Sequence, residues 1–214
     1  MSLLHYLSKK ISRKNLYKFI SNELNKQTNI NCLNIGSGGP IEELVKKLVK
    51  NYYSIDIDHS RKPNEIMDVC SENFKVNFKP NLVCIFETLE HCQNPIIAVK
   101  NIYKTLNKGN VCLASVPFNF HIHDEPNDFF RFTENGCKLI FQNFSQVKVL
   151  RRNGWLESVF VNIVRLDKEN NILSKIIGKT FIILYILFYP IIFIIQKIAP
   201  SKKLTTGYFI IAVK

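Results

Sequence analysis

The sequence predicts an α/β protein built on a mostly parallel sheet, and three observations support that fold class. Short apolar runs typical of strands alternate with helical patterns between residues 30 and 116. A glycine-rich turn at 36–39 joins the first run to a helix with Pro40 at its start. The run at 111–116 is continuously apolar, as in strands buried on both faces. Such strand–helix–strand units form parallel sheets, whose ligands bind at the carboxyl ends of the strands.

The elements can be placed in chain order. A basic amphipathic helix, or two, is expected over 1–26, where large apolar residues recur at helical spacing among lysines. Residues 27–214 form one domain, in which 155–206 is a hydrophobic and basic helical insertion before the last strand. Strands are predicted at 30–35, 52–56, 64–69, 81–86, 111–116, 147–150 and 208–213. Helices are predicted at 40–49, 95–106, 137–144 and 156–166.

The insertion contains an uncharged run of seventeen residues, 180–196, between Lys179 and Lys197. This length is at the lower limit of the roughly 17–25 residues that cross a bilayer, and Pro190 would kink the helix. A single crossing would leave the last strand on the opposite side of the membrane from the sheet that it completes. We therefore expect an interfacial or re-entrant hairpin bent near Pro190, with a buried core helix or a dimer interface as the alternatives.

The formal net charge of +12 is concentrated at the two ends of the chain. Residues 1–26 hold six basic residues and one acidic residue, and residues 146–214 hold eleven basic and three acidic residues. The middle of the chain, 27–145, is nearly neutral, with twelve basic and thirteen acidic residues. Basic ends beside apolar residues favour an anionic membrane surface over nucleic acid as the partner. The alternatives are solvated basic faces and, for 1–26, a helix packed as a lid on the sheet. Because 1–26 lack a continuous apolar core, we expect no secretory signal and a cytoplasmic location, peripheral or monotopic on the inner face of the membrane.

The six cysteines include no C-x-x-C pair, and most of them lie in or beside apolar runs. This pattern predicts reduced core residues rather than a disulfide framework or a zinc site. We therefore expect no metal centre.

The glycine-rich turn is suited to hold a ligand, although a purely structural turn is the alternative. It is not a dinucleotide site, because the third glycine of G-x-G-x-x-G is replaced by Ile41. Asp56 ends the second predicted strand, twenty residues after Gly36. A carboxylate there can accept both hydroxyls of a ribose, so the pattern indicates an adenosine ligand without a pyrophosphate.

Four ordered motifs resemble those of the class I S-adenosylmethionine-dependent methyltransferases. They are the glycine motif at 33–39, the second motif at 54–56, the Glu-x-x-Glu-His stretch within 85–91, and the helix and turn at 94–111. The closing run at 207–213 is similar to the last strand of that family. The resemblance implies a Rossmann-like sheet, mostly parallel with an antiparallel last strand, and helices on both faces. It also implies S-adenosylmethionine as the cofactor.

The resemblance further implies which residues bind the cofactor. The turn residues Gly36, Ser37 and Gly38 would approach the methionine moiety. Asp56 would bind the ribose, with Ile57 beside the adenine. The remaining positions are Asp68 near the adenine amino group and Glu87 by the methionine end.

Asn34, in the glycine motif, is the last residue expected to bind the cofactor. Asn34, Asp68 and Glu87 have further interpretations. The family usually has an acidic residue where this chain has Asn34, and an amide lacks the charge-assisted attraction for an ammonium or sulfonium group. Asp68 could instead be a turn residue. Glu87 could be a simple strand-end charge.

The segment at 117–133 resembles one in methyltransferases that are encoded with surface-polysaccharide enzymes. We expect this segment to lie over the cofactor and to supply the residues that bind the methyl acceptor. If the acceptor is a hydroxyl, a base must take its proton, and His123 is favoured because Asp124 is adjacent; His91 and His121 are the other candidates. Arg131 could bind a phosphate or carboxylate of the acceptor or clamp an aspartate of the loop.

These observations favour methyl transfer to a hydroxyl of a sugar or lipid-linked glycan at the membrane surface. A competing interpretation is methylation of a lipid headgroup or an isoprenoid such as a quinone precursor. A non-catalytic alternative is a membrane-docked scaffold with a degenerate cofactor site, which Asn34 favours. The sequence does not indicate an oligomeric state.

Overall fold

The computed structural model describes residues 3–36 and 38–214. Within them, one sheet has the strand order β3-β2-β1-β4-β5-β7-β6. Neighbouring strands from β3 to β5 are parallel, and β7 is antiparallel to both β5 and β6. The strands are β1 (Asn31–Ile35), β2 (Asn51–Asp56), β3 (Glu65–Ile66), β4 (Leu82–Phe86), β5 (Val111–Pro117), β6 (Gln146–Arg151) and β7 (Gly207–Val213). The predicted fold class is therefore confirmed.

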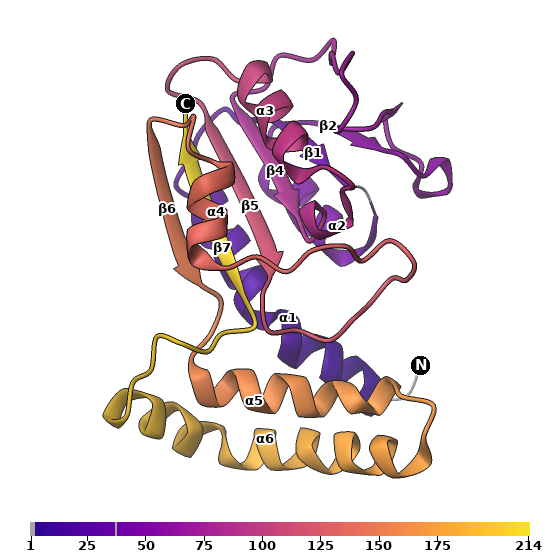
Figure 1. Cartoon of the computed structure of the whole chain (residues 1–214), viewed down its shortest axis with the longest axis vertical. Coiled ribbons are helices and arrows are strands. Elements are labelled where there is room, and N and C mark those ends of the chain that lie inside the picture. The colour runs from indigo at the N-terminus through magenta and orange to yellow at the C-terminus, as the bar shows by residue number, and fades with distance from the viewer. Residues whose placement is uncertain (1–2, 37) are drawn as a thin grey trace.

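Helices cover both faces of the sheet (Figure 1). They are α1 (Leu3–Leu24), α2 (Gly39–Leu48), α3 (Pro95–Thr105), α4 (Glu134–Ile140), α5 (Trp155–Val164) and α6 (Ile172–Ile198), with short 3-10 helices η1 (His59–Arg61), η2 (Leu89–His91) and η3 (Arg165–Lys168). The helix α4 begins earlier than predicted because Thr133 caps it, its hydroxyl accepting the Gly136 N–H at 3.0 Å.

Alternate residues of the central strands face two separate cores. Leu33 and Ile85 belong to the core under α3 and α4, while Cys32 and Cys84 belong to the core under α1 and α2. All six cysteines are free thiols, as predicted. The sheet is thus buried on both faces, which explains its continuously apolar strands.

The helix α1 is continuous and joins the sheet to the helices at one end of the molecule. Its second half enters the core, where Phe19 stacks on Phe209 of β7 with ring centroids 4.4 Å apart. Its first half packs beside η3, and the Ser8 hydroxyl donates to Asp167 Oδ1 at 2.8 Å. The apolar face of α1 is therefore largely covered by the protein itself.

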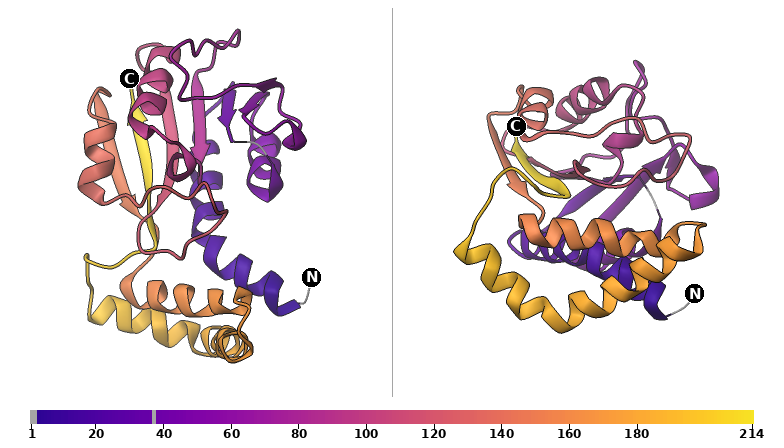
Figure 2. Two further views of the ribbon diagram at one scale, coloured as in Figure 1. Left: turned by 45° about the vertical axis from the view of Figure 1, so that its right-hand side comes forward. Right: turned by 60° about the horizontal axis from the view of Figure 1, so that its bottom comes forward.

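The helix α6 differs from the expected hairpin. It is one helix of 27 residues that contains Pro190, lies along α5 and bends in its second half (Figure 2). Proline removes one backbone hydrogen bond and kinks a helix, but the chain continues as helix beyond it. The helix is long and apolar enough to cross a membrane, yet only 17% of its most apolar window is buried. An apolar face of α6 is therefore exposed.

Candidate active site

A cavity of about 670 Å³ lies at the carboxyl ends of the parallel strands. The strands β4 and β5 point toward the end of the molecule formed by α5 and α6 (Figure 1). The cavity is lined by residues at or just after the ends of β1, β2 and β4, by the segment between β5 and α4 (residues 118–133), and by residues of α1 and η3. This position agrees with the strand-end site that the sequence predicts.

The glycine turn lines the cavity through Gly36 and Gly38. Both have positive φ angles, +86° and +102°, and a Cβ on Gly36 would lie 2.3 Å from the Thr88 hydroxyl. The predicted residue Ser37 lies outside the described residues. Asn34 stabilises the turn, because its Nδ2 donates to the Gly36 carbonyl at 2.9 Å. The site therefore uses Asn34 to support the turn, and this side chain does not line the cavity.

Asp56, Ile57 and Asp68 come together on the adjacent wall, as the sequence predicts. Asp56 Oδ1 accepts the Asp58 N–H at 2.8 Å, and Asp68 Oδ1 accepts the Cys70 N–H at 2.7 Å. The Ile57 side chain is 68% exposed and offers an apolar surface to a ring. Two fixed carboxylates beside an apolar surface fit the ribose and adenine of an adenosine ligand.

Glu87 lies in the cavity wall with a partner that the sequence did not indicate. Arg152 Nη1 donates to Glu87 Oε2 at 3.0 Å, Arg152 Nη2 contacts Oε1, and the Ser115 hydroxyl donates to Oε1 at 2.7 Å. Burial alone would raise the pKa of Glu87, but the charge and hydrogen bonds of Arg152 outweigh it, so the pKa is lowered. Glu87 is thus a largely shielded, paired carboxylate and not a simple strand-end charge.

Arg131 clamps the 118–133 segment. Its two terminal nitrogens donate to the two Asp128 oxygens, both at 2.6 Å, and one also donates to the His121 carbonyl at 3.0 Å. The hydrogen bonds from Arg131 lower the pKa of Asp128 to about 2. Asp128 in turn accepts the His123 N–H at 2.9 Å. Arg131 therefore positions the loop through Asp128, whereas Asp124 is exposed at the cavity edge.

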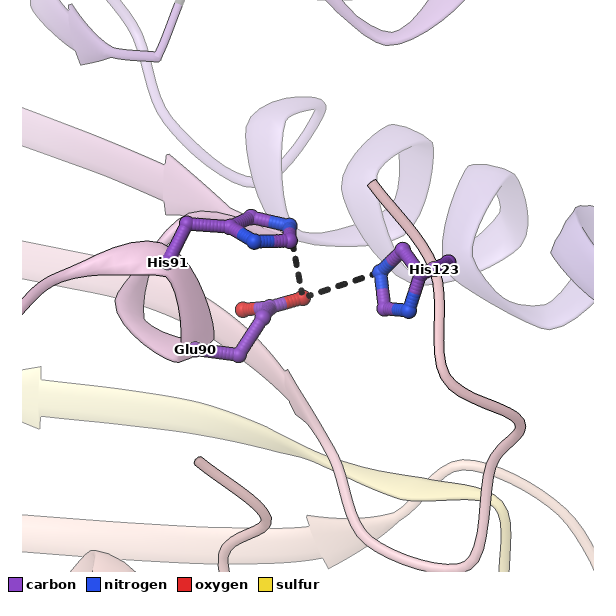
Figure 3. A group of neighbouring side chains, drawn as sticks. All are labelled: Glu90, His91 and His123. Carbon is purple, nitrogen blue, oxygen red and sulfur yellow. Dashed lines mark ion pairs between the residues drawn. The ribbon is translucent and has the colours of Figure 1, made fainter. Parts of the chain in front are cut away.

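His91 and His123 meet at the cavity wall with Glu90 between them (Figure 3). Glu90 Oε1 lies 3.8 Å from His123 Nε2 and 4.0 Å from His91 Nε2, and the imidazole centroids are 5.1 Å apart. Glu90 is fully buried, and neither of its carboxylate oxygens has a hydrogen-bond partner among the described residues. Burial raises the pKa of Glu90 well above its usual range, and the charge of Glu87 raises it further. The sequence indicated Glu90 only as part of a motif.

Two arginines face the cavity from α1 and η3, and the sequence did not assign either to the site. Arg13 and Arg165 both line it, beside Ser12. Arg165 is only 7% exposed, and burial together with the charge of Arg13 lowers its pKa to about 10. In the part of the chain that the structure describes, the arginines that form ion pairs are Arg61, Arg131 and Arg152. Arg13 and Arg165 are not in these ion pairs, although Asp124 and Asp167 act on Arg165 through their charges and Arg13 acts on Glu87 in the same way.

Comparison with known proteins agrees with this geometry. The profile of a family described as a methyltransferase domain matches residues 3–157, which is more than half of the chain. A search of curated protein sequences found no match.

Solved structures show the same fold. The chain is similar to a methyltransferase dependent on S-adenosylmethionine from Archaeoglobus fulgidus, with a TM-score of 0.61 and 16% identity over 94% of each chain. It is also similar to the N-methyltransferase NodS from Bradyrhizobium japonicum in complex with S-adenosylhomocysteine, with a TM-score of 0.54 and 13% identity over 65% of this chain and 79% of that one. A Haemonchus contortus phosphoethanolamine N-methyltransferase gives a TM-score of 0.57 and 13% identity over 94% of this chain and 52% of that one. The chain therefore belongs to the methyltransferase-domain family and has the Rossmann-like fold of the class I S-adenosylmethionine-dependent methyltransferases.

Proposed function

We propose that this methyltransferase uses S-adenosylmethionine to methylate a hydroxyl of a sugar or lipid-linked glycan at the cytosolic surface of a membrane. The observation that carries the proposal is one cavity that combines an adenosine-type wall, at Asp56 and Asp68, with a histidine wall, at His91 and His123. A cofactor and an acceptor can therefore lie side by side in it.

The cofactor side is formed by the glycine turn and the two aspartates. Gly36 and Gly38 would allow the methionine moiety to approach the backbone, Asp56 would accept the ribose hydroxyls, and Asp68 would accept from the adenine amino group. The cofactor supplies a methyl group on a sulfonium, whose displacement needs alignment more than covalent help from the protein. The paired Glu87 lies near the turn and would limit the room for the methionine end.

The acceptor side is formed by the clamped 118–133 segment. An acceptor hydroxyl must lose its proton, and a histidine can accept one near neutral pH. We assign the role of proton acceptor to His123. His91 lies beside it, and Asp124 also lines the cavity. Arg131 acts indirectly, because its bonds to Asp128 hold His123 in place.

Two arginines of the cavity that form no ion pair within the described residues support an anionic acceptor. Arg13 and Arg165 line the cavity, and guanidinium groups bind phosphate oxygens well. A lipid-linked glycan has phosphates between the sugar and the lipid and so fits this wall. A phosphorylated headgroup would also fit it, and the similar Haemonchus enzyme was solved with phosphomonomethylethanolamine. Headgroup methylation is therefore the second candidate function.

The exposed face of α6 supports a membrane surface. Its solvent-facing large apolar residues include Leu187, Ile191 and Ile194, each at least half exposed. Lysines lie along the helix and just beyond it at Lys175, Lys179, Lys197, Lys202 and Lys203. Apolar surface flanked by lysines suits an anionic bilayer. Because β7 returns to the sheet after α6, the helix would lie on the bilayer rather than cross it.

The cofactor site can be tested by calorimetric titration with S-adenosylmethionine and S-adenosylhomocysteine. We expect micromolar binding that Asp56→Ala abolishes, because the ribose hydroxyls lose their acceptor. Folded protein that binds neither ligand would instead favour the non-catalytic scaffold.

Membrane docking can be tested by sedimentation with vesicles that contain phosphatidylglycerol. We expect Leu187→Gln/Ile191→Gln/Ile194→Gln to release the protein from the vesicles. The matched control Ile96→Gln/Leu139→Gln changes exposed residues of α3 and α4 and should sediment normally. If both variants sediment like the wild type, the α6 face serves another purpose, and sedimentation without vesicles will show whether it joins two copies.

A further inference from the structure

We propose that Glu90, His91 and His123 bind one divalent first-row transition-metal ion at the acceptor wall of the cavity. One ring nitrogen of each histidine and one carboxylate oxygen lie within 4.8 Å of one another, and it is the two Nε2 atoms that face Glu90 Oε1. Two imidazoles and one carboxylate suit ions such as Zn²⁺ or Co²⁺ better than Mg²⁺ or Ca²⁺, which prefer oxygen ligands.

The distances in the cluster fit ligands of a common ion better than hydrogen-bond partners. Glu90 Oε1 is 3.8 Å from His123 Nε2 and 4.0 Å from His91 Nε2, which is too long for a hydrogen bond. With bonds of about 2.1 Å, two ligands of a tetrahedral ion lie roughly 3.4 Å apart. The two separations from Glu90 Oε1 would therefore need to shorten by about half an ångström, and the separation of the two histidine nitrogens, which is within 4.8 Å, by at most about 1.4 Å.

Both histidines are held in the tautomer that metal binding requires. His91 Nδ1 lies 2.8 Å from the Asn127 carbonyl oxygen. His123 Nδ1 lies 3.3 Å from the His121 carbonyl oxygen and 3.4 Å from Asp128 Oδ2. These partners can only accept, so each Nδ1 carries the hydrogen and each Nε2 has its lone pair directed toward Glu90 (Figure 3). A histidine that binds a metal usually donates a hydrogen bond from its other ring nitrogen to a carbonyl or carboxylate oxygen, which fixes the orientation of the ring.

Glu90 supplies an independent indication of a ligand. It is 0% exposed, and neither oxygen has a hydrogen-bond donor among the described residues. Removing a carboxylate from water without any donor costs several kcal/mol. The charges of Arg152 and Arg131 offset this cost only in part, because their hydrogen bonds go to Glu87 and Asp128. A cation between Glu90 and the two imidazoles would give the buried carboxyl group the partner that it lacks.

The role of the ion rests on the proposed function. Three protein ligands leave at least one position open, and His91 and His123 line the cavity, so an acceptor hydroxyl can bind there. The ion would lower the pKa of that hydroxyl, whose proton would leave to solvent. An oxygen lone pair would then form the new O–CH₃ bond as the S–CH₃ bond of the cofactor breaks, which releases S-adenosylhomocysteine. An Nε2 that coordinates an ion cannot accept a proton, so the ion would replace the His123 imidazole as the activating group.

The binding experiment uses the full chain after dialysis against a chelator and then titration with Co²⁺. We expect one ion per chain and visible absorption bands typical of a four- or five-coordinate nitrogen and oxygen site, without a thiolate charge-transfer band. Glu90→Gln and His123→Gln should each weaken binding by roughly 100-fold or more, since ligand loss costs at least as much as loss of a supporting group. His59→Gln, at an exposed histidine outside the cluster, should bind like the wild type.

The result that overturns the proposal is folded wild-type protein without stoichiometric binding, or binding that Glu90→Gln and His91→Gln leave unchanged. His91 is partly exposed, so His91→Gln remains informative even if Glu90→Gln does not fold. Calorimetry with S-adenosylmethionine on the same samples separates the two proposals. If the metal-free protein binds the cofactor and transfers methyl groups at the full rate, the metal site is wrong while the methyltransferase function stands.

Discussion

Arg152, just after β6, pairs with Glu87, just after β4, with Arg152 Nη1 and Glu87 Oε2 3.0 Å apart. The two side chains are 2% and 14% exposed, so the pair is largely shielded from water. It ties the antiparallel half of the sheet to the parallel half at the wall of the cavity. The shape of the cavity therefore depends on β6 as well as on the parallel strands that carry the glycine turn.

We expect Arg152→Met to lower the free energy of unfolding by roughly 3–5 kcal/mol, because it leaves Glu87 buried without its partner. The pKa of Glu87 in the folded variant should then rise above its unfolded value. An acid with a raised pKa loses stability as pH increases, so the variant should be more stable at pH 5 than at pH 8. Urea denaturation at both values measures this difference.

The double variant Glu87→Gln/Arg152→Met provides the control for that prediction. It removes the unpaired charge and should recover part of the loss, with little change between pH 5 and pH 8. A single variant that shows no pH dependence would mean that water reaches Glu87 once the arginine is gone.

Arg131→Gln should loosen the 118–133 segment, because it breaks both bonds to Asp128 and the bond to the His121 carbonyl. We expect faster limited proteolysis within this segment and a loss of roughly 2 kcal/mol in unfolding free energy. The matched control is Lys138→Gln, which breaks an exposed ion pair with Glu134 on α4 and should change neither quantity measurably. Equal cleavage of the two variants would show that other contacts hold the loop.

The sequence predicted those parts of the site that depend on local patterns. Asp56 ends β2 and Asp68 follows β3, which are parallel neighbours, so topology alone brings the two residues to one edge of the sheet. Arg152 could not be paired with Glu87 in advance, because 65 residues separate them and antiparallel β7 intervenes. The meeting of Glu90 with His123 likewise depends on how the 118–133 segment folds back.

The errors in the prediction have physical causes as well. Pro190 suggested a hairpin, but a proline inside an apolar helix can kink it without ending it. Arg13 lies within the basic amphipathic helix predicted over 1–26, but the spacing of charges in that helix cannot show that Arg13 lines the cavity. Helical periodicity predicts that a helix has an apolar face, but it does not predict whether the polar face lies in solvent or lines a cavity.

Gly36→Ala should destabilise the protein more than Gly109→Ala does. Both glycines have similar φ angles, +86° and +85°, but a Cβ on Gly36 would lie 2.3 Å from the Thr88 hydroxyl, whereas nothing lies within 4 Å of one on Gly109. The backbone strain of about 1 kcal/mol is common to both variants. Urea denaturation should show an additional loss of roughly 1–3 kcal/mol for Gly36→Ala, and calorimetry should show weaker cofactor binding for that variant only. Equal losses would mean that Thr88 moves aside at no cost.

Glu42 supports the glycine turn from α2, and its charge should make the turn sensitive to acid. Its carboxylate accepts the Gly38 N–H at 2.5 Å and the Tyr52 hydroxyl at 2.8 Å, and it pairs with Lys46. Burial would raise the pKa of Glu42, but these partners outweigh it and the pKa is lowered. We expect Glu42→Gln to lower the unfolding free energy by about 1 kcal/mol at pH 7, since the hydrogen bonds lose their charge.

The pH dependence of that loss follows from the direction of the shift. An acid whose folded-state pKa is lowered stabilises the protein above its unfolded pKa of about 4.3 and loses this contribution as pH falls through the folded value. The gap between wild type and Glu42→Gln should therefore close as the pH falls below about 4. Glu43→Gln, at the exposed neighbouring position, should follow the wild type throughout. Once the Glu42 carboxyl group is protonated, it differs from Gln only in the atoms that it presents to Gly38. A difference in unfolding free energy that persists at pH 3 would therefore mean that Glu42 acts through the geometry of its hydrogen bonds and not through its charge.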